Sequence, residues 1–509
     1  MKEKLILAAI LVLSALIRIY LITFYSVPFA ADMGRDLLWS KDISFYHIPT
    51  LIGPAGSIWG VYFGPFWFYL LSVPLWLTQG NPLSAVYTTC LIILACGLLS
   101  YIFFKNYLGK KYIYILPIII LFNANLISVS TFAFHANVLP TLTLLMIYFC
   151  FLAVIKSPYY LSLSFFAVSL MFHADPAPAV VFSFVPFCCF FVFKLYKNKK
   201  ILKIICLSTV AYLIPFLPQI LFELRNNFTQ TRSLISYISG NNPSLSGQLP
   251  FLERIPNRFA VYFDFIKSGF AGNNNLLAIT LFVLVIYGLF KFLKNEKDYK
   301  ALVLYKISAL AFITSFLIFS LIITVEIKGW YLFGISTIVA LLIFFALIGL
   351  KNRIIVVLFL CLFVSVNCIH ILNIKANQSV KHDPALLSNQ LNAISLIYNL
   401  SQNEPFSVYV FTPSIYDYNY QYLFWWIGNI KNKDLPEDFA YLPEKPDYVR
   451  NKSIYAKDGK VSKTVFLIIE QTKENPYYTS SNWLKNFDDY KLVWEHDINQ
   501  AVKIQKRIK

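Results

Sequence analysis

Two carboxylates and an arginine stand together just after the first long apolar segment of the sequence. Asp32 and Asp36 are four residues apart with Arg35 between them, in the stretch ADMGRD. On a helix this spacing places both carboxylates on one face. Charges cost on the order of several kcal/mol in hydrocarbon, so the cluster marks either the membrane–water boundary or a polar site facing it. Asp32 also suits a helix N-cap, and a capping carboxylate can be a catalytic group as well.

Further polar side chains stand in three short turns between apolar segments. They are His135 and Asn137 in the first turn, His173 and Asp175 in the second, and Glu326, Lys328, Trp330 and Tyr331 in the third. Each also has a structural explanation, such as a helix start at Asp175 before a proline. Together on one side of a membrane they would form an acidic, imidazole-bearing cavity. His135, His173 and Asp175 could bind a divalent metal, but they match no recognised metal-ligand motif, so a metal is possible without being indicated and no other cofactor is assigned.

The composition indicates the elements that must position these residues. Hydrophobic residues make up 58% and charged residues 14% of the chain, against about 25% charged in soluble proteins. Apolar runs of about 17–25 residues, each long enough to cross a bilayer, recur over the first three quarters of the sequence. The predicted fold class is therefore an all-α polytopic membrane protein of about 11 crossings. The predicted helices are 5–24, 84–104, 112–133, 138–155, 159–172, 177–193, 203–222, 275–293, 301–325, 331–350 and 354–372.

The net charge of +18 reports topology, because the basic residues fall in alternate loops between apolar runs. The basic clusters are Lys105/Lys110/Lys111, Lys156, 194–203, 291–300 and Lys351/Arg353. The positive-inside rule places these loops in the cytoplasm, together with the N-terminus, and the polar turns outside. A nucleic-acid partner is not expected. A crossing at 61–77 would invert every later loop, so we expect 25–83 to be one outer loop with two juxtamembrane helices.

Two more regions are expected outside the membrane. Residues 223–274 form a second polar outer loop that is rich in arginine. Residues 373–509 lose the membrane composition and predict a small extracytoplasmic α/β domain, separate from a membrane domain over 1–372. Its predicted elements are a helix beginning at Asp383-Pro384, strands at 406–412 and 464–470, a helix at 416–427 and a hairpin of 491–494 with 501–505. All eight cysteines lie in apolar segments, which argues against extracytoplasmic disulfides.

At these residues the chain resembles the integral-membrane glycosyltransferases of the GT-C class. The likeness is to the branch with protein O-mannosyltransferases, the lipid A aminoarabinose transferase and the Rgt-type sugar transferases. It covers residues 1 to about 372. It rests on the first helix, ADMGRD in a large outer loop, the Pro-aromatic stretch GPFWFY from Gly64, and the turn Phe134–Asn137. Signatures of soluble enzymes and nucleotide-driven pumps, such as a Walker loop, GxSxG or HExxH, do not occur in the sequence.

The resemblance implies transfer of a sugar from a polyprenyl-phosphate donor to an acceptor hydroxyl at the outer face of the plasma membrane. The acceptor would be a cell-envelope glycan, a lipid or a protein, and relatives commonly need no metal. The family's first-loop carboxylate corresponds to Asp32, as the general base of an inverting displacement, with Asp36 as the alternative. Two departures stand out. Relatives often have Asp-Glu where Asp32 is followed by Met33, and a Lys beside the Pro-aromatic helix where this chain is apolar.

The resemblance also requires a cation, because the leaving lipid phosphate carries growing negative charge. The candidates are Arg35, Arg225, Arg232, Arg258 and Lys328. The other expected substrate-binding residues are His135, Asn137, His173, Asp175 and Tyr331.

Two alternative functions remain open. A polysaccharide polymerase or ligase would use an undecaprenyl-diphosphate-linked chain, and the arginines of 223–274 are compatible with a diphosphate. A lipid-linked sugar flippase or transporter would also span the membrane. Transporters often show matched halves and ionisable residues at mid-membrane depth, whereas here the polar residues gather at the ends of helices.

Overall fold

A computed structural model describes residues 2–108, 112–240, 249–378, 381–412, 416–431, 433–438, 461–474, 476 and 478–509. Lys110 and Lys111 of the first basic cluster lie outside these ranges. Contacts group the chain into two compact units. The first unit is Met1–Arg18, Thr50–Trp67 and Thr88–Ala376, and the second unit is Ile19–Pro49, Phe68–Tyr87 and Asn377–Lys509.

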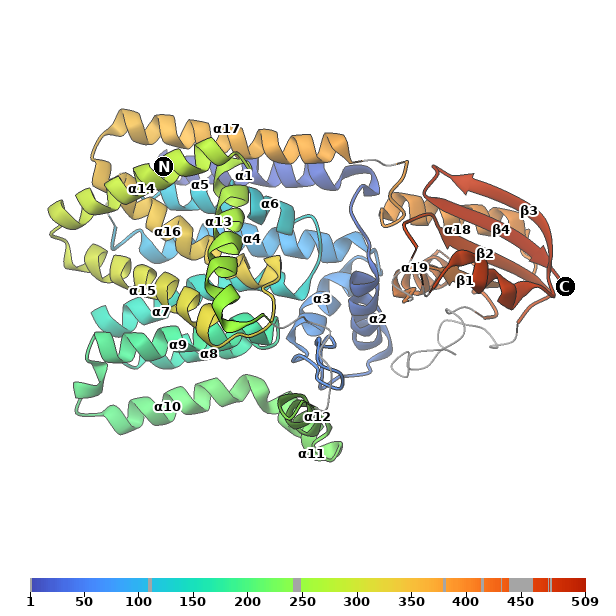
Figure 1. Cartoon of the computed structure of the whole chain (residues 1–509), viewed down its shortest axis with the longest axis horizontal. Helices are drawn as coiled ribbons and strands as arrows, with labels where there is room; N and C mark the ends of the chain where they lie inside the picture. The colour runs from blue at the N-terminus through green and yellow to red at the C-terminus, as the bar shows by residue number, and fades with distance from the viewer. Residues whose placement is uncertain are drawn as a thin grey trace. The chain divides into compact units, whose positions relative to one another are not determined.

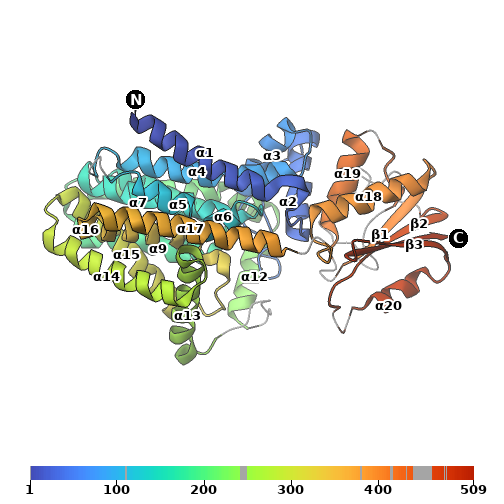
Figure 2. The same ribbon diagram turned by 90° about the horizontal axis from the view of Figure 1, so that it is seen from above.

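The first unit is built from helices, as the apolar runs predict. The helices in it and at its borders are α1 (Lys2–Ile22), α4 (Leu83–Phe104), α5 (Ile115–Leu121), α6 (Ala124–Val129), η2 (His135–Val138), α7 (Leu139–Ile155), α8 (Tyr160–Met171), α9 (Pro176–Val192), η3 (Leu195–Lys197), α10 (Ile201–Leu213), η4 (Ile214–Phe216), α11 (Leu217–Arg225), α12 (Thr229–Ile238), α13 (Phe251–Ala271), α14 (Asn275–Asn295), α15 (Tyr299–Leu321), η5 (Gly329–Leu332), α16 (Phe333–Leu350) and α17 (Arg353–Asn377). The axes of α15, α16 and α17 are roughly aligned, and the chain alternates in direction from one helix to the next (Figures 1 and 2).

Eight helices in the described part of the chain are long and apolar enough to cross a membrane. Three shorter apolar helices are α3 (Phe66–Leu77), α8 and α9. The 12 residues of α3 span about 18 Å at 1.5 Å per residue, well short of a hydrocarbon core of about 30 Å. Helix α8, in the predicted crossing 159–172, has the same 12 residues, so the exclusion of 61–77 as a full crossing stays a prediction from the charge pattern.

The predicted continuous helix 112–133 is wrong, because the structure breaks it into α5 and α6. Asn123 caps α6 by accepting a hydrogen bond from the Leu126 N–H. The guanidinium of Arg18, buried on α1, donates to the carbonyls of Leu121 and Leu126 on either side of the break and to Ser130. Backbone carbonyls freed by a break inside a membrane helix need such donors.

The second outer loop, expected over 223–274, contains helix. It holds α12 and the 21-residue α13, which ends at Gly272 in the left-handed conformation. Both helices have exposed apolar residues, among them Leu234 and Phe259, and α13 also buries Arg258, Tyr262 and Phe270. The polar composition of this segment is therefore that of amphipathic helices.

The second unit combines helices with one sheet, which confirms the predicted α/β character of the C-terminal region. Its elements are η1 (Thr23–Tyr25), α2 (Ala31–Tyr46), most of α3, α18 (Leu387–Ser401), β1 (Phe406–Phe411), α19 (Tyr418–Ile430), β2 (Thr464–Glu470), α20 (Ser480–Leu484), η7 (Lys485–Phe487), β3 (Lys491–Ile498) and β4 (Val502–Ile508). The strand order is β1-β2-β4-β3, with β1 and β2 parallel and the other pairs antiparallel.

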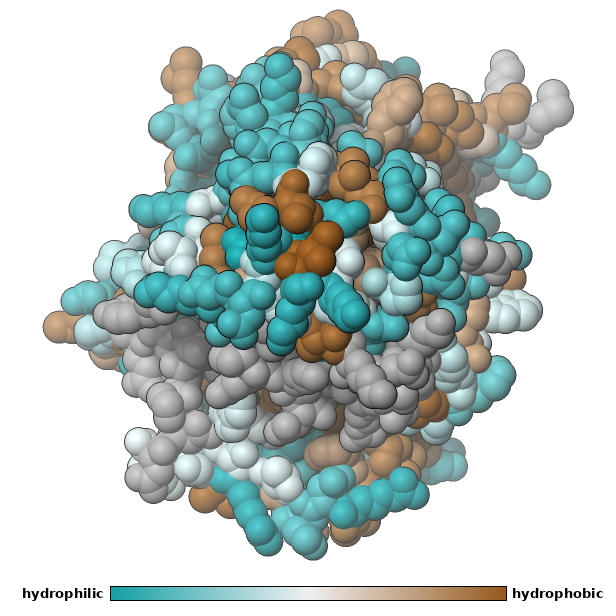
Figure 3. All heavy atoms as spheres, turned by 90° about the vertical axis from the view of Figure 1, so that its right-hand side faces the viewer, coloured by the Kyte–Doolittle hydropathy of each residue, from teal (hydrophilic) through white to brown (hydrophobic). Residues whose placement is uncertain are grey.

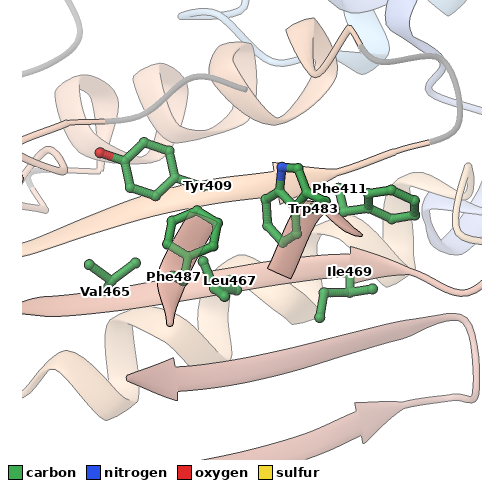
Figure 4. Packing of buried hydrophobic residues seen from close by; sticks show 7 residues of the cluster. All are labelled: Tyr409, Phe411, Val465, Leu467, Ile469, Trp483 and Phe487. Carbon is green, nitrogen blue, oxygen red and sulfur yellow. The ribbon is translucent and has the colours of Figure 1, made fainter. Parts of the chain in front are cut away.

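Alternation along β1 and β2 gives the sheet two buried faces. The odd-numbered residues of both strands pack with Trp483 and Phe487 from α20 and η7 (Figure 4). On the even-numbered face, the ring of Phe406 contacts Tyr398 of α18 and Phe466. The outer strand β3 is largely exposed, and the face seen in Figure 3 is mainly hydrophilic.

The first helix of the C-terminal region is α18, and its predicted start at Asp383-Pro384 is wrong, because it begins at Leu387. The Asp383 carboxylate instead accepts a hydrogen bond from the Ala385 N–H at 3.0 Å and stabilises a turn before the helix. This turn pairs with the segment before α2, since the Phe29 N–H donates to the Ala385 carbonyl at 2.7 Å.

Candidate functional site

The acidic cluster of the first loop lies at the start of α2 in the second unit. Asp32 is not the N-cap, which corrects that prediction, because Ala30 occupies this position and makes no side-chain cap. Asp32 instead stands in the first turn, where a carboxylate is favoured by the helix dipole. Its side chain is 56% exposed and accepts a hydrogen bond from Arg35 Nη1 at 2.8 Å.

Arg35 connects two carboxylates of very different exposure. Its Nη2 and Nε lie 2.8 and 3.0 Å from one carboxylate oxygen of Asp36, whose side chain is only 2% exposed. The buried Asp36 thus fixes the guanidinium, and the guanidinium holds the exposed Asp32. Of the two carboxylates, Asp32 is the one that a substrate hydroxyl can approach.

Helix α2 is held in place by α19. A Cβ atom added at Gly34 would lie 2.3 Å from the backbone nitrogen of Asn419, so only glycine permits this close approach. Further along α2, the buried Lys41 forms an ion pair with Asp42 and lies over the rings of Tyr46 and Trp425. The acidic turn is therefore carried by a packed helix.

The turns of the first unit converge on the Pro-aromatic segment. His173 Nε2 lies 2.8 Å from the Pro215 carbonyl, and the Phe66 N–H donates to His173 Nδ1 at 3.3 Å. Burial lowers the pKa of His173 to about 4, against the opposing effect of the Pro215 carbonyl. A Cβ at Gly64 would lie 2.1 Å from His173 Nδ1, so the glycine of GPFWFY makes room for this ring.

Asp175 lies beside the third turn. It caps α9, as predicted, by accepting the Ala177 N–H at 3.1 Å. Burial raises the pKa of Asp175 to about 7, although hydrogen bonds from the Ala177 N–H and the Trp330 side chain act in the other direction. The Tyr331 hydroxyl also interacts electrostatically with this carboxyl group.

His135 and Asn137, the two polar residues of the first turn, have different hydrogen-bond partners. The His135 ring contacts Phe63 and Phe134, with Nδ1 hydrogen-bonded to the Ala174 carbonyl in the second turn. Asn137 instead bonds within its own turn, where its Nδ2 donates to the Val129 carbonyl at 3.0 Å. The structure thus brings His135, His173, Asp175 and Tyr331 together and leaves Asn137 as a support of the turn.

The cationic candidates differ in the partners they already have. Arg258 is buried and donates to the carbonyls at the end of α15. Arg225 and Arg232 are exposed on α11 and α12. Lys328 pairs with Glu326 at 2.7 Å, is 36% exposed and lies two residues before Trp330. Within the first unit, Lys328 is the exposed cation next in sequence to the cluster of turns.

The sequence analysis named Trp330 and Gly64 but gave neither of them a role in shaping this cluster. Trp330 contacts Phe134 edge-on with ring centroids 5.5 Å apart, and Gly64 accommodates His173. An aromatic residue beside a polar turn was a usable signal, since such rings often bind sugars or other rings. The contact between Gly64 and His173 left no signal in the sequence.

Within the described ranges, no group of three or more His, Cys, Asp or Glu side chains is arranged to hold a metal ion. The eight cysteines are free thiols.

Comparison by structure gives a likeness over nearly the whole chain, although no family model and no curated protein matches the sequence. The structure of ArnT from Cupriavidus metallidurans bound to undecaprenyl phosphate is similar with a TM-score of 0.65 at 10% identity, covering 98% of this chain and 97% of that one. Its apo structure gives the same TM-score at 9% identity, covering 99% and 98%. The archaeal oligosaccharyltransferase AglB from Archaeoglobus fulgidus is more distant, with a TM-score of 0.45 at 13% identity, covering 92% of this chain and 70% of that one. The chain therefore has the fold of ArnT, a GT-C membrane glycosyltransferase, as its sequence resemblance led us to expect.

Proposed function

We propose that this protein transfers a sugar from a polyprenyl-phosphate carrier to an acceptor hydroxyl at the outer face of the membrane. The observation that carries the proposal is the exposed Asp32 carboxylate, paired with Arg35 while Asp36 is buried. The fold likeness to ArnT over nearly the full length of both chains supports it.

Asp32 is the proposed general base. It takes the proton of the acceptor hydroxyl as that oxygen attacks the anomeric carbon of the sugar. The bond from this carbon to the phosphate oxygen breaks, and the polyprenyl phosphate leaves with the electron pair. One displacement inverts the configuration at the anomeric carbon. Asp36 would act indirectly, by fixing the guanidinium that orients Asp32.

Lys328 is the proposed partner of the leaving phosphate. Arg35 already neutralises two carboxylates, and Arg258 is held by backbone carbonyls. Lys328 pairs with Glu326, whose side chain is 55% exposed, and an ammonium group on a flexible stem can turn toward a phosphate.

Within the first unit, the buried turns are proposed to form the surface that receives the sugar. His173, with its lowered pKa, is neutral near pH 7. The partly exposed Trp330 ring lies beside Phe134 and Asp175. An aromatic face next to neutral polar groups suits a sugar ring, which has both apolar faces and hydroxyl groups.

The test is sugar transfer by the purified full-length protein in liposomes, from a panel of radiolabelled polyprenyl-monophosphate and polyprenyl-diphosphate sugars. A membrane extract supplies the acceptor. Asp32→Asn should lower turnover at least about a hundredfold, the usual contribution of a general base.

Asp264→Asn is the matched control, because Asp264 forms the same i,i+3 pair at 2.9 Å with a side chain 66% exposed. Equal activity of Asp32→Asn and wild type would remove Asp32 from the chemistry. Transfer from diphosphate donors alone would favour a polymerase or ligase.

A further inference from the structure

A groove opens on the first unit between α9 and α10, with α8 as its floor. Helix α8 packs against both of these helices, and α10 lies at the edge of the bundle (Figure 1). The cavity has a volume of about 660 Å³, within the range of pockets that hold small molecules. Its lining is almost wholly apolar and aromatic, and Phe187, Phe191 and Ile205 at its mouth are half-exposed. Such a surface requires an apolar occupant.

The groove lies toward the end of α9 that is remote from the polar turns. Helix α9 begins at Pro176, directly after the Asp175 turn, and ends at Val192. At 1.5 Å per residue, the lining residue Phe187 lies about 17 Å along the axis from Pro176. The positive-inside rule places this end of the helices at the cytoplasmic side. An occupant of the groove therefore comes from the cytoplasmic leaflet.

The loop that joins α9 to α10 places lysines at this end of the groove. All five are exposed, and they are Lys194, Lys197, Lys199, Lys200 and Lys203. No acidic residue occurs in the sequence between Asp175 and Glu223. Lys203 Nζ of α10 lies 5.9 Å from the centre of the Tyr159 ring, directly before α8. Positive charge thus stands where the groove between these helices ends.

The loop is folded, so the backbone that carries these lysines has a fixed position. Leu195 is 8% exposed and packs in one cluster with Leu161 of α8. The Asn198 side chain accepts a hydrogen bond from the Lys200 N–H at 2.9 Å, and its carbonyl accepts one from the Ile201 N–H at 3.1 Å. Basic groups positioned beside an apolar groove bind an anionic lipid at a lower cost in conformational entropy.

A buried hydroxyl group inside the groove points to the same kind of ligand. Ser208 is 7% exposed, and its Oγ has no hydrogen-bond partner within the part of the chain that the structure describes. It lies five residues beyond Lys203 on α10, about 7–8 Å along the axis. This length matches the headgroup layer of a bilayer, about 5–8 Å thick. The hydroxyl can therefore donate to an ester carbonyl of a lipid whose phosphate lies at Lys203.

We propose that the groove between α9 and α10 binds an anionic phospholipid of the cytoplasmic leaflet. One acyl chain lies along Phe187, Phe191 and Ile205, and the phosphate contacts Lys200 and Lys203. A zwitterionic phospholipid fits less well, because its own ammonium group repels the lysines. The sugar donor is a different ligand, since its phosphate is proposed to lie beside the polar turns. This lipid site does not depend on the proposed sugar transfer.

Native mass spectrometry of the delipidated full-length protein in detergent tests the proposal. Phosphatidylglycerol and phosphatidylcholine with the same acyl chains are titrated separately, and the dissociation constant of the first bound lipid is measured. Each lysine near an anionic headgroup contributes about fivefold in affinity. The double variant Lys200→Gln/Lys203→Gln should therefore bind phosphatidylglycerol about 25-fold more weakly than wild type, with unchanged binding of phosphatidylcholine.

The matched control is Lys291→Gln/Lys294→Gln, in another basic cluster where Lys291 Nζ lies 5.5 Å from the centre of the Tyr287 ring. It should bind both lipids like wild type. Thr209→Trp fills the groove from an exposed position and should weaken binding of phosphatidylglycerol. Size-exclusion chromatography checks that each variant is folded.

Three results would overturn the proposal: equal affinity of wild type for the two lipids, equal losses in the two double variants, or unchanged binding by a folded Thr209→Trp variant. A competition with polyprenyl phosphate completes the test. Equimolar polyprenyl phosphate should leave phosphatidylglycerol bound, and displacement would assign the groove to the sugar carrier instead.

Discussion

The acidic turn of α2 and the histidine-bearing turns of the first unit use polar residues in opposite ways. At α2 the groups are charged and paired, and one carboxylate is exposed. In the turns the groups are buried and bonded to backbone carbonyls, and burial moves the pKa values of His173 and Asp175 toward their neutral forms. A charged, accessible group suits proton transfer, whereas buried neutral groups suit a rigid binding surface.

The largest expected effect separates the two carboxylates of α2. Asp32→Asn should abolish most turnover and leave the melting temperature unchanged, because its pair is exposed. Asp36→Asn should lower the free energy of unfolding by about 3–5 kcal/mol, because it leaves Arg35 without its buried partner. Activity and thermal melting of both variants check this. Equal behaviour of the two variants would break the contrast between exposed and buried carboxylates.

A smaller effect is expected at the glycine behind His173. Gly64→Ala places a Cβ 2.1 Å from the ring and should cost about 1–3 kcal/mol of stability through overpacking. Gly329→Ala is the control, because no heavy atom lies within 4 Å of its added Cβ. Thermal melting in detergent measures both, and an unchanged Gly64→Ala variant would show that the turns are less rigid than the contacts indicate.

The Lys328→Gln variant tests whether the positive charge of Lys328 contributes to sugar transfer. Because this contact strengthens as charge grows on the leaving phosphate, its loss should lower kcat/KM for the donor about tenfold, mainly through kcat. Lys503→Gln is matched to it, since Lys503 pairs with Glu495 at 3.0 Å and is 31% exposed. A variant with an unchanged kcat/KM would transfer the phosphate role to Arg225 or Arg232.

A pH dependence of stability is expected at Asp175. Its folded pKa is about 7 and its ordinary value is 3.8. Between these values the folded protein holds a proton that the unfolded chain has lost, so this group lowers stability as pH rises. The Asp175→Asn variant still has a side chain that can cap α9. It should remove the loss of stability that Asp175 causes as pH rises.

The variant should therefore gain melting temperature relative to wild type as pH rises through this window. His173 has the opposite dependence, because its folded pKa is lowered, but it is present in both proteins. A constant difference in melting temperature between the two proteins from acidic to neutral pH would contradict the buried, neutral state of Asp175.

The sequence by itself determined the elements and several of their ends. Apolar runs placed α14, α16 and α17 within a few residues of their observed bounds, and the strand predicted at 464–470 is β2. Asp175 before Pro176 marked the start of α9. These features depend on neighbouring residues, since length, hydropathy and capping act over a few positions.

Only the tertiary structure decided which polar groups are buried, paired or exposed. Asp32 and Asp36 are alike in the sequence, and packing buries one of them. The break before α6 depends on Arg18, more than 100 residues away, and the orientation of α13 depends on its contacts with Asn125 and with the Val325 carbonyl. Contacts between residues far apart in the chain exist only when the whole core is packed, so a local pattern cannot specify them.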